Sequence, residues 1–99
     1  MILRMWHGYT APQGADAYEA MLRETILPGL HRVSGYRGAY VARRNVESEV
    51  EFMTLTMWDS MDAVHAFSGN GRAVIHETAR PLLIHFDEYS IHYDGTFVP

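Results

Sequence analysis

Hydrophobic and polar side chains alternate along two stretches of the chain, which is the pattern of a β-strand with two different faces. In residues 2–10, one face carries Leu3, Met5, His7 and Tyr9. In residues 50–58, Met53, Leu55 and Met57 form one wholly apolar face. The other face mixes aromatic rings with hydroxyl groups, as Phe52, Thr54, Thr56 and Trp58. Both stretches are therefore predicted to be strands of a sheet.

Between these strands the spacing of apolar residues is helical. The cluster over residues 11–14 predicts a break, and residues 15–27 predict a helix that Pro28-Gly29 ends or kinks, with a short turn over 30–33. Residues 36–44 predict a strand. A turn over 45–48 joins it to the strand 50–58, so these two strands are expected to form a hairpin.

The second half of the chain repeats this order. Asp59-Ser60 supplies an N-cap for a helix that reaches about residue 67, and the glycines of Gly69-Asn70-Gly71 stop it. Residues 72–80 predict another short helix before Pro81. Residues 82–86 are apolar and ambiguous, and the alternation over 88–94 predicts a last strand.

The element order is βαβ followed by βαβ, which predicts an α+β fold of the ferredoxin-like split βαβ type. Such a fold places its helices on one face of a four-stranded antiparallel sheet. With 99 residues, the chain is expected to form a single domain over residues 1–99. A domain of this size buries a limited share of its surface, so a second protomer would add stability.

The alternation also predicts which residues meet the helices. The face with His7 and Tyr9 is expected to look toward the helices, which leaves aromatic side chains on the helix-free face. Aromatic groups are costly to leave in water, so this face is expected to meet a second copy of the chain. The predicted dimer interface contains Trp6, Phe52 and His92, while Trp58 stays ambiguous because a bulge at the strand end would turn it over.

Composition narrows the function classes. The formal net charge is -4, with no basic patch of the kind that binds nucleic acid. There is no cysteine, and no two histidines have the spacing of a local metal site, so no metal is expected. Neither a membrane-spanning stretch nor a signal peptide is visible, which favours a cytoplasmic location.

The six histidines are the one unusual feature of the composition. His7 and His76 are predicted to frame a cavity between the sheet and the helices, where a neutral imidazole could accept a phenolic proton. Tyr9, Tyr18 and Trp58 could orient a flat aromatic substrate by stacking. The alternative interpretation makes His7 a hydrogen-bonded histidine at the edge of the core and His76 an exposed helix residue. No nucleophile elbow or nucleotide-binding fingerprint is present.

Three stretches of the chain resemble the antibiotic-biosynthesis-monooxygenase family. They are residues 2–8, the passage from Pro28 to Gly38, and the strand 51–60, which ends in Trp-Asp-Ser before a helix with Phe67. The resemblance implies a dimeric α/β barrel and one of two chemistries. Some members oxygenate phenolic or quinol substrates without a cofactor, and others cleave haem.

In the haem-degrading branch the resemblance implies an Asn, a Trp and an iron-binding His at the places of His7, Phe67 and His76. Only the histidine matches. We therefore expect a cofactor-independent monooxygenase that acts on a small electron-rich aromatic, with His7 and His76 as catalytic residues and Phe67 among the substrate-binding ones. The alternatives are a haem-binding or haem-degrading protein, and a dimer that binds a small ligand or responds to stress without catalysis.

Overall fold

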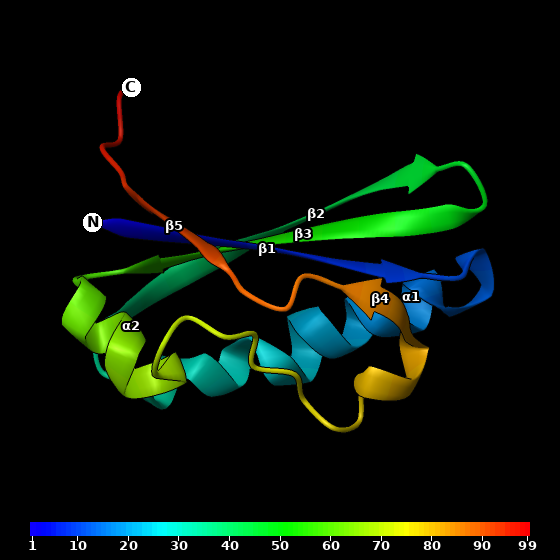
Figure 1. The fold of residues 1–99 in the computed structure, drawn as a ribbon, viewed down its shortest axis with the longest axis horizontal. Coiled ribbons are helices and arrows are strands. Elements are labelled where there is room, and N and C mark those ends of the chain that lie inside the picture. Colours follow the sequence, from blue (N-terminus) through cyan, green and yellow to red (C-terminus); the bar gives the residue numbers. More distant parts are fainter.

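The computed structural model describes residues 1–99 and contains one antiparallel sheet. The strands lie in the order β2 (Tyr36–Val46), β3 (Glu49–Trp58) and β1 (Ile2–Thr10), and β1 pairs on its other edge with both β4 (Leu83–Phe86) and β5 (Ile91–Asp94). The helices all cover one face of this sheet (Figure 1). The predicted α+β, ferredoxin-like arrangement is confirmed, with five strands because the last strand is divided in two.

Two predictions about the helices are wrong. The first helix, α1 (Pro12–Met21), begins inside the predicted break and continues as the π-helix η1 (Leu22–Ile26). Proline suits the first position of a helix, where its missing N–H has no partner to lose. The predicted helix over 72–80 is absent. Residues 73–76 are irregular, and only the short 3-10 helix η3 (Arg80–Leu82) follows.

The irregular segment forms main-chain hydrogen bonds with the residues between β4 and β5, where the edge strand is interrupted. Between β4 and β5 the Asp87 carboxylate accepts the His7 main-chain N–H at 2.9 Å, in place of a main-chain carbonyl. Beyond this point Ala73 donates to the Glu88 carbonyl at 2.8 Å, and Ser90 donates to the Gly71 carbonyl at 3.0 Å. These main-chain bonds compete with helical ones, which explains why the segment is not a helix.

The two faces of the sheet are the reverse of the prediction. Phe52 and Trp58 are fully buried beneath the helices, where Phe52 meets the Tyr18 ring edge-on at 4.8 Å. Trp6 and His92 lie on the same helix-covered side. The prediction that Trp6, Phe52 and His92 form an interface on the helix-free face is therefore wrong. Alternation separates two faces without saying which one the helices cover, and here both faces are apolar.

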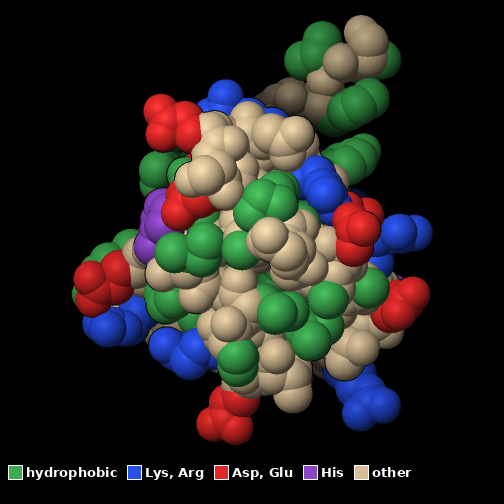
Figure 2. All heavy atoms as spheres, turned by 90° about the vertical axis from the view of Figure 1, so that its right-hand side faces the viewer, with side chains coloured by type: hydrophobic (Ala, Val, Ile, Leu, Met, Phe, Trp, Pro, Cys, Tyr) green, Lys and Arg blue, Asp and Glu red, His purple; other side chains and the backbone are tan.

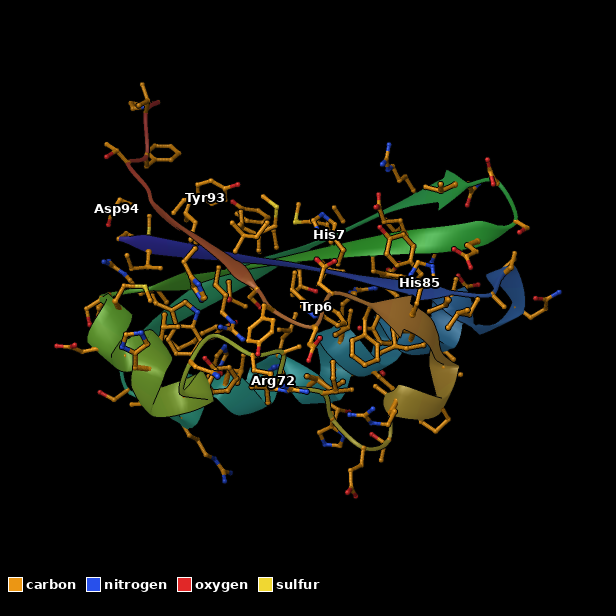
Figure 3. The ribbon with its side chains drawn as sticks, in the orientation of Figure 1. Trp6, His7, Arg72, His85, Tyr93 and Asp94 are labelled. Carbon is orange, nitrogen blue, oxygen red and sulfur yellow. The ribbon has the colours of Figure 1, made fainter.

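The helix-free face carries the residues that were expected to look inward. Figure 3 shows His7 and Tyr93 on the side of the sheet away from the helices, with Trp6 on the helix side. Three large side chains on this face stay well exposed: Tyr40 at 65%, Ile91 at 49% and Tyr93 at 49%. They continue the apolar row that Met53, Leu55 and Met57 form on β3.

The helix α2 (Met61–Ser68) is fixed against the start of β2. Ser60 caps it by accepting the Ala63 N–H at 3.2 Å, as predicted. Gly35 has a φ of +87°, and a Cβ atom there would lie 2.5 Å from the Cβ of Ala63. This close approach needs glycine for two reasons, a left-handed backbone and no side chain.

We therefore expect Gly35→Ala to lower the free energy of unfolding by about 1–3 kcal/mol, through backbone strain and the contact with Ala63. Gly29 is the matched control, because nothing lies within 4 Å of its Cβ position. Gly29→Ala is expected to change the stability by less than about 1 kcal/mol, in the stabilising direction. Urea denaturation of both variants measures the difference, and equal effects would contradict this packing of α2.

Candidate functional site

An apolar cavity lies between the helix-covered face of the sheet and the helices. Its volume is about 210 Å³, and 11 of its 16 lining residues are hydrophobic. The strands β1 and β3 form its floor. The helices α1, η1 and η2 (Pro28–Arg32) cover it, α2 closes one end with Phe67, and the irregular segment reaches it with Val74 and Ile75. The sequence-based prediction of a cavity between sheet and helices is confirmed.

The cavity brings together only some of the predicted site residues. Tyr18, Phe67 and His76 line it, and Trp58 packs behind Phe67 with a ring separation of 5.0 Å. His7 and Tyr9 do not reach it, because their side chains point from β1 to the helix-free face. The structure therefore does not place His7 beside His76, and Trp6 occupies the β1 position at the cavity instead.

The most polar residue at the cavity is Arg4, which is only 5% exposed. Its Nη1 bonds with Ser68 Oγ at 3.1 Å and with His92 Nε2 at 2.9 Å, and its Nη2 donates to the Arg72 carbonyl at 3.1 Å. No carboxylate pairs with Arg4, although six other salt bridges of the chain involve arginine. Burial lowers the pKa of Arg4 from its usual range.

His92 is a neutral acceptor for this guanidinium. Because a guanidinium only donates, Nε2 of His92 carries no proton and the ring holds its hydrogen on Nδ1. Burial lowers the pKa of His92, and the charges of Arg4 and His65 lower it further. Of the two contacting side chains, Arg4 and His92, Arg4 therefore carries the only positive charge.

Several hydroxyl groups on cavity residues have no partner within the chain. Thr54 Oγ1 and Ser90 Oγ are buried without a hydrogen bond. Burial raises the pKa of the Tyr18 phenol well above its usual range, so Tyr18 stays protonated and can donate. The polar side chains at the cavity are therefore one cation, hydroxyl groups and His76, with no acid among them.

His76 lies at the exposed rim of the cavity. Its Nδ1 accepts the Thr78 main-chain N–H at 3.3 Å and lies 2.6 Å from Thr78 Oγ1. Since a main-chain N–H can only donate, the proton of the neutral imidazole is on Nε2. His76 is thus set up to donate a hydrogen bond from Nε2 rather than to accept a proton there.

The helix-free face holds a separate polar group around His7. Nδ1 of His7 lies 2.9 Å from Asp87 Oδ2, and Tyr9 donates to Glu51 at 2.6 Å. His85 stacks on Tyr9 with a ring separation of 4.1 Å. No three His, Asp or Glu side chains of the chain converge as a metal site would require. These contacts make His7 a hydrogen-bonded residue of the helix-free face.

The residues at the cavity do not fit haem in this arrangement. The volume of about 210 Å³ is below the roughly 300–1,000 Å³ that is usual for drug-sized ligands, and a porphyrin is no smaller than these. Phe67 stands where the haem-degrading pattern has Trp.

Sequence reasoning missed Arg4, Trp6 and Ser90 as cavity residues. Arg4 and Trp6 are two residues apart on β1, so a correct choice of the buried face would have found both. Ser90 precedes β5 and carried no signal, because the break in the edge strand that positions it depends on Asp87 and β1.

Acid is expected to destabilise the fold through His92. Its pKa is lower in the folded chain than the value of about 6.5 in the unfolded one. Below a pH of about 6.5 the unfolded chain therefore binds more protons, and the free energy of unfolding falls as the pH drops toward the folded pKa.

In His92→Gln the amide oxygen still accepts from Arg4 but no longer titrates, so its melting temperature should depend less on pH between about 5 and 7. His31→Gln, at an exposed position on η2, is the control and should follow the parent chain. Thermal melts across this range decide the matter; a His92→Gln profile as steep as the parent's would exclude His92 as the source.

Comparisons with known protein families and solved structures show what the chain is similar to. The family model described as antibiotic biosynthesis monooxygenase matches residues 1–73. No curated protein sequence matches significantly. None of the helices combines the length and apolar character needed to cross a bilayer.

Two solved structures share the fold. One is a Bacillus cereus protein provisionally described as an antibiotic biosynthesis monooxygenase, with a TM-score of 0.69 and 13% identity over 100% of this chain and 96% of that one. The other is the haem degrader MhuD from Mycobacterium tuberculosis, solved with two haems in its active site, with a TM-score of 0.64 and 14% identity over 100% and 99% of the two chains. At these identities they show the fold alone. Since the family model spans most of its length, the chain belongs to the antibiotic biosynthesis monooxygenase family.

Proposed function

We propose that this protein is a cofactor-independent monooxygenase that acts on a small electron-rich aromatic, a phenol or quinol of one or two rings. The observation that carries the proposal is the cavity, which is apolar, lined by aromatic rings and about 210 Å³ in volume. An apolar cavity of about 150 Å³ holds one benzene molecule, so this one suits a two-ring body. Family membership supplies the reaction class.

The proposed reaction balances without an external reductant. A phenol loses two hydrogens and gains one oxygen atom to become a quinone, while the second atom of O₂ leaves with those hydrogens as water. The substrate provides all four electrons that reduce the two oxygen atoms of O₂. The phenolate is the form that reacts with O₂, because its ring is richer in electrons than that of the phenol.

Three side chains would act on such a substrate. Phe67 and Tyr18 line the cavity and would hold the ring between them. His76 at the rim would donate from Nε2 to the oxygen that leaves as water, in a role of acid rather than of base. His7 has no role in this scheme, because it lies on the other face of the sheet.

We also propose that the protein is a homodimer that pairs through the helix-free face. Exposed apolar surface on this scale is typical of an interface, and Tyr40, Ile91 and Tyr93 add to it. A two-fold axis would bring β3 of one copy near β3 of the other, with Leu55 at the centre of the contact.

The proposed activity predicts oxygen consumption with a panel of phenols and naphthols in the presence of a metal chelator. With ¹⁸O₂, one labelled atom should enter each quinone molecule and one should enter water. His76→Ala is expected to lower kcat by about 100-fold, because a positioned acid contributes on this scale. His76→Gln keeps a donor and should recover part of the loss.

His65→Ala is the matched control, since His65 is exposed on α2 and does not line the cavity. Label incorporation from water instead of O₂ would overturn the reaction. A saturable Soret band on addition of hemin, abolished in His76→Ala, would favour the haem-binding alternative in its place.

The proposed dimer predicts that Leu55→Arg is a monomer by light scattering on a sizing column. A charge at the centre of an apolar interface costs more than the contacts there can repay. Arg37→Glu is the control: Arg37 lies at the start of β2 and is exposed, in contact with Asp59. A dimer that persists in Leu55→Arg would exclude this face.

A further inference from the structure

The charge of Arg4 is not neutralised within the chain. Its side chain contacts a serine hydroxyl, a neutral imidazole and a main-chain carbonyl, and no carboxylate. A guanidinium stays protonated even when buried. At 5% exposure this charge therefore lacks both water and a counter-ion.

Such an arrangement is costly for a structural residue. Buried charges in proteins are usually paired, because removing a charge from water costs several kcal/mol. The chain has twelve acidic residues, and none of them reaches Arg4. Three contacts also leave part of the guanidinium unused, since Nε makes no hydrogen bond.

The surroundings of Arg4 at the cavity offer more donors and no acid. Thr54 faces the cavity from the neighbouring strand β3, is 8% exposed, and leaves its buried hydroxyl unpaired. Ser90 on the other side of β1 leaves its hydroxyl unpaired as well. Tyr18 can donate from the helix above. All of these groups can satisfy oxygen atoms of a ligand.

We propose that Arg4, with Thr54 and Ser90, forms an anion subsite at the inner wall of the cavity, so that the ligand is an aromatic body that carries an ionised oxygen group. A carboxylate and a phenolate share this chemistry, and each would supply the missing counter-ion. The charge of the ligand sits against Arg4, and its ring lies between Phe67 and the apolar residues of η1. This inference rests on the proposed function only for the cavity as the binding site, not for the oxygen chemistry.

The positive charge of Arg4 also affects the proposed reaction. A guanidinium beside a phenolic oxygen favours the ionised form of that oxygen. Arg4 would therefore hold the substrate as the phenolate without a general base in the cavity. This role replaces the one that the sequence assigned to His7.

The test compares two probes that differ in charge and little in shape, naphthoate and naphthamide, by isothermal titration calorimetry with the full chain at pH 7.5. Naphthoate is expected to bind at least about 10-fold more tightly, because only the carboxylate neutralises Arg4. In Arg4→Met the two probes should bind equally tightly, because the charge that distinguishes between them is gone. Arg4→Lys should keep part of the preference.

Arg37→Met removes an exposed arginine away from the cavity and is the matched control, with both affinities unchanged. Equal binding of the two probes to the unmodified chain overturns the proposal without need of any variant. So does a preference for naphthoate that persists in Arg4→Met, because its source would then lie elsewhere. Naphthoate preference without oxygen uptake by any phenol would keep the anion subsite and reject the monooxygenase.

Discussion

The buried guanidinium of Arg4 is the interaction on which the arrangement around the cavity depends. From the middle of the sheet it reaches β5 through His92, the end of α2 through Ser68, and the irregular segment through the Arg72 carbonyl. The first strand, the stretch from Ser68 to Arg72 and the last strand thus meet at one side chain. Its position also puts a positive charge at the wall of a mainly apolar cavity.

A second constraint is the break between β4 and β5. The side chain of Asp87 takes the place of a main-chain acceptor opposite His7, and its carbonyl accepts the Trp6 indole N–H at 2.8 Å. Within the break, Glu88 accepts from Ala73 and Ser90 donates to Gly71 through their main-chain groups. The break therefore ties the irregular segment to the sheet, and that segment carries Val74 and His76 to the cavity.

Surface charge agrees with a small-molecule role. Acidic and basic side chains alternate around the end of the molecule that Figure 2 shows, and no basic patch forms there. The C-terminal tail projects away from the sheet on the side without helices (Figure 1), and Phe97 and Val98 in it are each 80% exposed.

The candidate site was only partly predictable. Tyr18 followed from helical spacing, whereas Phe67 and His76 followed from the resemblance to the family's haem-degrading pattern. His7 and Tyr9 were misplaced by a different step. Their strand was located correctly, but one register has two faces, and choosing the wrong one moved every side chain of β1 and β3 together.

The sequence by itself determined the strands β1, β2 and β3, the presence of α1 and α2 between them and after them, and the two caps of α2, because these depend on local spacing, on Ser60 and on Gly69. Tertiary structure alone decided which face of the sheet the helices cover. It also decided that Arg4 is buried without a counter-ion, and that residues 71–73 pair with the edge strand. These outcomes depend on contacts between residues distant in the sequence, such as Arg4 with Ser68, and no local pattern encodes them.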